Sequence, residues 1–122
     1  MKNILENEVI YITGASAGIG YATAELCLSY GATVVITGRN VDNLDKANQE
    51  LLKISSKVIS HNVDVSNESE IVDSLQEIHT SFGKVDGLIN NAPSIHTGKI
   101  IDLDLDAWRT NFKANLDAVF LT

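Results

Sequence analysis

The chain has 122 residues, of which 44% are hydrophobic and 20% charged, and its formal net charge is −7. This length and composition predict a single globular domain spanning residues 1–122. The acidic balance argues against nucleic acid or an anionic membrane as partner, because either would require a basic face. No run approaches the ~18 apolar residues of a membrane span, and the first residues do not read as a signal peptide, so we expect a cytoplasmic protein.

Short β-branched runs alternate with segments of helical period along the chain. The runs predict four strands, at Val9–Thr13, Thr33–Thr37, Lys57–Asn62 and Val85–Asn90. Three apolar helical stripes are expected between them, formed by Ile19, Ala22, Leu26, Cys27 and Tyr30, by Leu44, Ala47, Leu51 and Ile54, and by Ile71, Leu75, Ile78 and Phe82. This order predicts an α/β fold with a doubly wound parallel sheet of the Rossmann type.

Helix ends can be read from several polar residues and one glycine. Gly31 suits the left-handed residue that ends the first helix, and Ser66 is expected to cap the third. A fourth helix is expected from about Asp104, with one apolar side formed by Trp108, Phe112, Leu116, Val119 and Phe120.

We expect no metal site. The single cysteine, Cys27, excludes an internal disulfide and a cysteine-based structural metal site, and is expected to be a buried core thiol. His61, His79 and His96 do not have the spacing of metal ligands.

A glycine-rich loop, Thr13–Gly20, separates the first strand from the first helix. In that context the glycines suggest a phosphate site, because the helix N-terminus presents free N–H groups to an anion. A turn that merely needs small residues is the alternative. A P-loop NTPase is excluded, because Tyr21-Ala22 follows the last glycine where Lys-Ser/Thr would be needed.

The loop resembles the cofactor loop of the short-chain dehydrogenase/reductase family. Further stretches match in order over essentially the whole chain, namely Arg39, Asp64-Val65, Asn90-Asn91-Ala92 and Asn115. The resemblance implies a domain that binds NAD or NADP and an enzyme that transfers hydride between nicotinamide and a carbonyl or alcohol substrate. The chain stops where such an enzyme would be about half finished, so we expect a fold truncated after the fourth βα unit.

The resemblance assigns the pyrophosphate to the glycine loop. Gly14 permits the turn, Gly18 lets backbone approach the ligand, and Gly20 allows close packing of helix on strand. The Ser16 hydroxyl and the Ile19 amide are candidate phosphate donors.

Two later stretches complete the implied cofactor site. Asp64 is expected to accept a hydrogen bond from the adenine amino group, with the Val65 amide donating to the ring, although Asp64 could be only a loop acid. Asn91 and Ala92 are implied to border the cofactor. Pro93 stands where relatives usually have glycine, so it either reshapes the nicotinamide half of the site or only stiffens the loop.

The end of the second strand favours NADP over NAD. An NAD-specific site carries a carboxylate there for the ribose 2′-hydroxyl, whereas this chain has Gly38 and then Arg39. A guanidinium can bind the 2′-phosphate of NADP with paired hydrogen bonds. An ordinary solvated arginine is the alternative, and Ala17 offers no second positive charge.

The family's catalytic serine and its tyrosine followed four residues later by lysine are absent. The only tyrosines are Tyr11, Tyr21 and Tyr30, and none has that lysine. Of the implied catalytic set only Asn115 is present. A non-catalytic dinucleotide-binding module, a regulatory fragment and a remnant with a structural role are therefore alternatives to an enzyme.

We also expect association with other chains. Stopping at Thr122 would leave the sheet edge at Val85–Asn90 and the apolar side of the fourth helix uncovered. Exposed edges and apolar patches recruit partners, so a homo-oligomer or a complementing polypeptide is expected.

Overall fold

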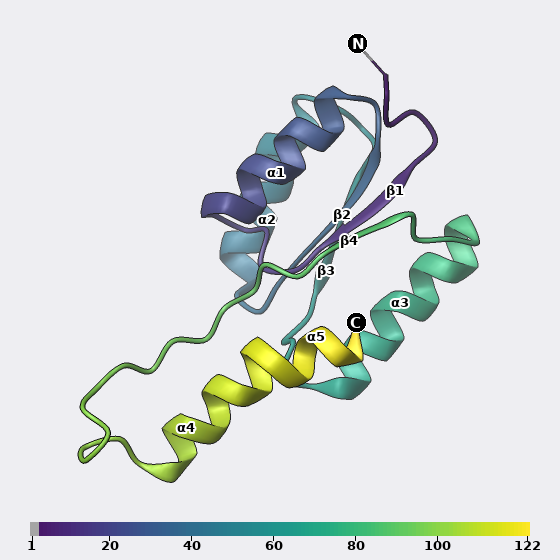
Figure 1. Cartoon of the computed structure of the whole chain (residues 1–122). Coiled ribbons are helices and arrows are strands. Elements are labelled where there is room, and N and C mark those ends of the chain that lie inside the picture. The colour runs from purple at the N-terminus through teal and green to yellow at the C-terminus, as the bar shows by residue number, and fades with distance from the viewer. Residues whose placement is uncertain (1–2) are drawn as a thin grey trace.

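A computed structural model describes residues 3–122 (Figure 1). Four parallel strands form one sheet in the order β3-β2-β1-β4. The elements in chain order are β1 (Val9–Ile12), α1 (Gly18–Ser29), β2 (Thr33–Gly38), α2 (Val41–Leu52), β3 (Val58–Asn62), α3 (Glu68–Phe82), β4 (Gly87–Ile89), α4 (Leu105–Phe112), the π-helical turn η1 (Lys113–Asp117) and α5 (Ala118–Leu121). The predicted Rossmann-type α/β fold is confirmed.

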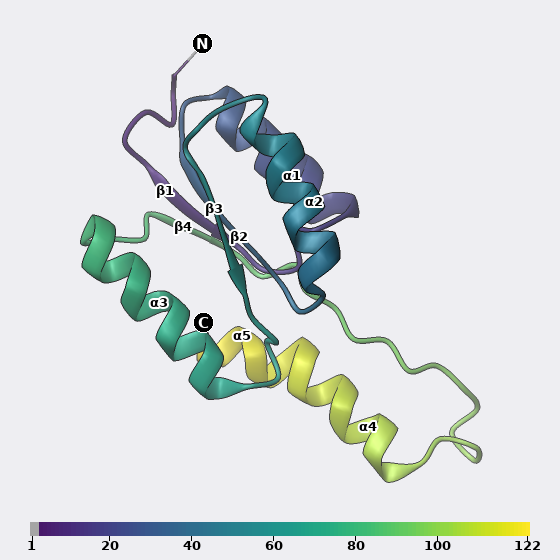
Figure 2. The same cartoon turned by 180° about the vertical axis from the view of Figure 1, so that it is seen from behind.

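Helices cover both faces of the sheet. Helices α1 and α2 lie on one face, and α3 with the α4–α5 arm lies on the other, as the two opposite views show (Figures 1 and 2). Alternate residues of β1 point to opposite cores: Ile10 and Ile12 belong to the cluster under α1 and α2, whereas Val9 and Tyr11 belong to the one under α3. Burial on both faces explains why the strands are apolar nearly throughout.

The helix ends correct one prediction and confirm two. Asp104 caps α4 by accepting from the Ala107 amide at 2.7 Å, and Gly31 has the expected positive φ of 96°. Ser66, however, does not cap α3. Asn67 takes that position, because the Ser66 hydroxyl is already bonded to Asp64 in the preceding turn.

The predicted buried face of α1 is wrong. Ile19 and Leu26 have 79% and 56% of their surface exposed, while Gly20, Ala24 and Leu28 face the sheet. Apolar residues surround this helix on nearly every side, so the sequence period could not identify its buried face. Cys27 is half-buried against the core and remains free, and burial raises the pKa of its thiol.

The arm formed by α4, η1 and α5 is anchored by small residues. Only Ala114 and Ala118 are buried in it. Leu121 is partly buried against the same core, whereas the other large apolar side chains of the arm are exposed, namely Leu105, Trp108, Phe112, Leu116, Val119 and Phe120. Among residues 3–122 no helix is both long and apolar enough to cross a membrane.

Candidate cofactor site

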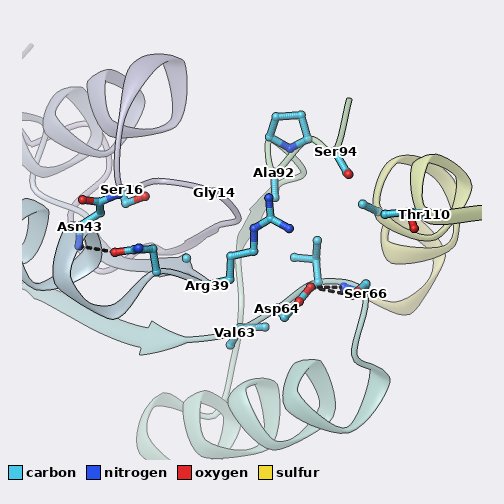
Figure 3. Close-up of a pocket in the computed structure, with 15 residues that line it drawn as sticks. Gly14, Ser16, Arg39, Asn43, Val63, Asp64, Ser66, Ala92, Ser94 and Thr110 are labelled. Carbon is cyan, nitrogen blue, oxygen red and sulfur yellow. Dashed lines mark hydrogen bonds between the residues drawn. The ribbon is translucent and has the colours of Figure 1, made fainter. Parts of the chain in front are cut away.

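The loops at the carboxyl edge of the sheet surround a cavity of about 450 Å³ (Figure 3). In an open α/β sheet, ligands bind at this edge where strand order reverses, which here lies between β1 and β4. The cavity is lined by Gly14, Ser16, Gly38, Arg39, Asn40, Asn43, Val63, Asp64, Val65, Ser66, Ala92, Pro93, Ser94, Thr110 and Ala114. The fold thus brings six predicted site residues to one cavity: Gly14, Ser16, Arg39, Asp64, Val65 and Ala92.

Two of the three loop glycines are required by the protein's own packing. A Cβ on Gly14, whose φ is 64°, would lie 2.6 Å from Ala92 Cα. A Cβ on Gly20 would collide with the Asn91 amide and lie 2.8 Å from the Gly14 carbonyl oxygen. Gly18 also has a positive φ, of 59°, but a Cβ there would meet nothing within 4 Å. The space above Gly18 is therefore open to a ligand.

Asn91 holds the glycine loop in shape. Its side-chain amide donates to the Thr13 and Gly14 carbonyl oxygens at 3.0 and 2.9 Å. In return, Thr13 Oγ1 accepts from the Asn91 and Ala92 backbone amides, each at 3.0 Å. The Asn91 side chain thus braces the glycine loop from the loop that follows β4 and does not line this cavity.

The N-terminus of α1 is left without a side-chain cap. Ala17 occupies the N-cap position, and the first turn carries no acidic residue. Since α2, α3 and α4 are each capped by a side chain, the free N–H groups and positive dipole of α1 remain available to an anion. Ser16 lines the cavity just before the first turn of α1, and Ile19 belongs to that turn.

Arg39 reaches into the cavity from the end of β2 (Figure 3). The Asn62 side chain steadies its backbone by donating to the Gly38 and Arg39 carbonyl oxygens at 2.8 and 3.1 Å. Within residues 3–122 the guanidinium makes no ion pair. Because the exposed Arg39 guanidinium has no ion-pair partner among the described residues, the end of the cavity near Arg39 is suited to a phosphate.

Asp64 lies across the cavity from the glycine loop and shapes its own turn. Its Oδ1 accepts from the Ser66 hydroxyl at 2.7 Å and from the Ser66 amide at 2.9 Å. These bonds, helped by the positive charges of Arg39 and Lys113, hold the pKa of Asp64 below its ordinary value. The carboxylate is therefore ionised at neutral pH and acts only as an acceptor.

Asn115 lies in η1, beside a smaller adjoining cavity of about 160 Å³ that Asn91, Ala92 and Pro93 also line. Its Oδ1 accepts from the Ser94 amide at 3.1 Å, and its Nδ2 donates to the Ser94 carbonyl oxygen at 2.5 Å. The side chain is thus bonded to the loop that follows β4.

Sequence reasoning missed two groups of long-range polar contacts. Asn111 bonds to the backbone of His96, and a chain of hydroxyls beneath α3 connects Tyr11 and Ser74 to His61. The only local signal for the contact between Asn111 and His96 was the spacing of Asn111 and Asn115, which are four residues apart in the same helical arm. In the part of the chain that the structure describes, no cluster of His, Cys, Asp and Glu is arranged to hold a metal ion.

A parallel sheet of this order, with a glycine loop at the N-terminus of α1, defines a Rossmann-type protein. A model of the short chain dehydrogenase family matches residues 8–122. The chain therefore belongs to the short-chain dehydrogenase/reductase family.

Known relatives agree with this assignment. An uncharacterised oxidoreductase of Staphylococcus aureus is 34% identical over 98% of this chain and 51% of its own length. A short chain dehydrogenase of Bacillus anthracis superposes with a TM-score of 0.90 at 32% identity, covering 96% of this chain and 48% of that one. A metagenomic short-chain oxidoreductase in complex with NADP has the same score and identity, covering 96% and 53%. The chain spans about half the length of these relatives.

Proposed function

We propose that residues 1–122 are the NADP(H)-binding part of an oxidoreductase that transfers hydride between nicotinamide and a carbonyl or alcohol substrate. The observation that carries the proposal is the Arg39 guanidinium, which points into the cavity without an ion-pair partner in residues 3–122. The NADP bound to the metagenomic relative supports the choice of cofactor.

We assign each part of NADP to a group at the cavity by its chemistry. The pyrophosphate would lie on the uncapped first turn of α1, over Gly18, with donors from Ser16 and the Ile19 amide. Arg39 would bind the 2′-phosphate with paired hydrogen bonds.

The two ends of the dinucleotide would then lie over different strands. The adenine would lie against Asp64 and Val65 after β3, and the nicotinamide would extend past Ala92 and Pro93 after β4. Pro93 has no N–H to donate, so this side of the site would recognise the cofactor by shape.

The bound cofactor would supply the hydride, and this chain would orient it. Asn115 would keep the loop bordering the nicotinamide end in place through Ser94. Because these 122 residues contain no serine with a Tyr-x-x-x-Lys pair, we expect the isolated chain to bind cofactor without turning over a carbonyl substrate. NADPH oxidation by the purified chain at ordinary enzyme rates would contradict this expectation and the alternative of a non-catalytic module alike.

Calorimetric titration of NADPH and NADH into the wild type and Arg39→Ala tests the cofactor assignment. Loss of charge-assisted hydrogen bonds worth about 1.5–3 kcal/mol should weaken NADPH binding roughly 10- to 150-fold, with NADH binding unchanged. Arg109→Ala is the matched control, because it removes the same charge from a residue that does not line the cavity. Equal affinity of the wild type for the two cofactors would refute the assignment.

We also propose that the exposed apolar side of the α4–α5 arm packs against another polypeptide, either a second copy or a complementing chain. The rings of Trp108 and Phe112 on this side are tilted by 38° with their centroids 4.8 Å apart, and both side chains are nearly half exposed. Burying a large apolar side chain contributes about 1.5–3 kcal/mol, so covering several of them would favour association.

A further inference from the structure

Two asparagines of the α4–η1 arm bind the loop after β4 in the same way. The Asn111 Oδ1 accepts from the His96 amide at 2.8 Å, and its Nδ2 donates to the His96 carbonyl oxygen at 2.9 Å. Asn115 makes the corresponding pair of bonds to Ser94. Each side-chain amide therefore satisfies both backbone groups of one loop residue, as a neighbouring strand would.

The spacing of the two pairs explains why they form together. Four residues along a helix advance about 6 Å, and two residues along an extended chain advance about 6.6 Å. Asn111 and Asn115 thus match His96 and Ser94, which are two residues apart. We call these four residues the asparagine clamp.

The clamp fixes a wall of the cofactor cavity. Ser94 is only 6% exposed and lines the cavity together with Pro93 and with Thr110, the residue next to Asn111. Figure 3 shows Ser94 and Thr110 on the opposite side of the cavity from Ser16, with Arg39 between them. Beyond the clamp the loop stays irregular and exposed from Thr97 to Lys99.

We propose that Asn111 is a positioning residue for the cofactor. It acts through His96 to hold the Pro93–Ser94 wall, which borders the nicotinamide end of the site, across the cavity from Arg39 and Asp64. This inference rests on the proposed function and adds to it a residue without contact to the ligand. Asn115 alone would hold the wall at one point and leave it free to pivot about Ser94.

The experiment is calorimetric titration of the wild type, Asn111→Ala and Arg109→Ala with NADPH and with adenosine 2′,5′-bisphosphate. Losing two neutral hydrogen bonds that hold the wall should raise the Kd of NADPH about tenfold in Asn111→Ala. The Kd of adenosine 2′,5′-bisphosphate, which lacks the nicotinamide half, should stay at the wild-type value. The binding stoichiometry should stay at the wild-type value, because a variant that was merely less folded would lose binding-competent molecules and keep the Kd of the remainder. Arg109→Ala, on the same helix, should bind as the wild type does.

Amide hydrogen exchange provides a second measurement on the free protein. In Asn111→Ala the His96 amide should lose protection while the Ser94 amide keeps it. If the wild type binds, an unchanged Kd of NADPH in Asn111→Ala, an equal rise in the Kd of adenosine 2′,5′-bisphosphate, or unchanged protection of His96 would overturn the clamp proposal alone. A wild type that binds neither ligand would refute the proposed function, and the positioning role with it.

Discussion

The hydroxyl oxygens of Tyr11 and Ser74 lie 2.7 Å apart in the buried layer between the sheet and α3. Ser74 Oγ also lies 2.7 Å from His61 Nδ1, and His61 Nε2 lies 3.6 Å from a carboxylate oxygen of Glu77. One polar chain therefore runs from the fully buried side chain of β1, through α3 and β3, to the surface. It ties three elements together across an otherwise apolar interface.

Removing the Tyr11 hydroxyl should lower the stability of the fold moderately. Tyr11→Phe should lower the free energy of unfolding by about 0.5–1.5 kcal/mol, because Ser74 keeps its bond to His61 and no buried partner is left unsatisfied. Urea denaturation monitored by circular dichroism measures the change. Tyr30→Phe is the control, since the Tyr30 hydroxyl has no hydrogen bond within residues 3–122, and an equal loss in both variants would contradict the role of the network.

Tyr11 should also make the fold sensitive to alkali. Burial raises the pKa of Tyr11 above its ordinary value of 10.0, with the bond to Ser74 opposing the shift. The folded state then holds its proton more tightly than the unfolded state, so this stabilisation is complete below pH 10 and is lost as pH rises through the folded pKa. Unfolding free energies measured from pH 8 to 11 should fall less steeply in Tyr11→Phe. Parallel curves would show that Tyr11 does not contribute.

Asp64 should make the folding stability depend on pH in the acid range, where stability should fall as pH falls. Its pKa is held below the ordinary 3.8, first by the bonds from Ser66. The stabilisation is therefore present above that ordinary value and is lost as pH falls through the lowered one. Asp64→Asn should be less stable than the wild type at pH 7, and the difference should vanish near pH 2. Asp45→Asn, on the exposed side of α2, should show no such dependence, and a pH-independent difference for Asp64→Asn would exclude the carboxylate as its source.

Gly18 and Gly20 should respond differently to the same substitution. Gly18→Ala places a side chain at a positive φ, at a cost of about 1–2 kcal/mol, in a space that is otherwise open. The methyl group would lie where we place the pyrophosphate, so NADPH binding should fall while the chain still folds. Gly20→Ala would push against Asn91 and the Gly14 carbonyl and should lower the melting temperature more. Undiminished NADPH binding by Gly18→Ala would show that the ligand lies elsewhere.

The exposed arm should mediate association. Phe120 is 89% exposed on α5, and we expect the wild type to sediment as a dimer or larger species at micromolar concentration. Phe120→Asp should shift this distribution toward the monomer, because a charge would have to be desolvated at the interface. Ile101→Asp, at a loop position that is 86% exposed, is the matched control. A stable monomeric wild type would refute the association proposal.

The element order, the parallel sheet and the glycine loop follow from local sequence alone. Apolar β-branched runs, a glycine after α1 at positive φ and Asp104 before α4 each act over a few residues, so their structural consequences can be read in place. Two helix ends, at Gly31 and Asp104, followed the same logic, whereas Ser66 had a competing partner in Asp64 and the fourth strand is shorter than predicted. Six of the proposed cofactor residues reached one cavity because parallel strands must bring their carboxyl ends to the same edge.

Packing between distant segments decided the rest. The buried side of α1 depends on Gly20 and Ala24 letting the helix approach the sheet, and helical period carries no information on that distance. The commitment of Asn91 to the glycine loop, like the contact of Tyr11 with Ser74, joins residues more than 60 positions apart. Such pairs form only when the sheet and helices have assembled. The sequence around one partner therefore gives no sign of which distant residue it will contact.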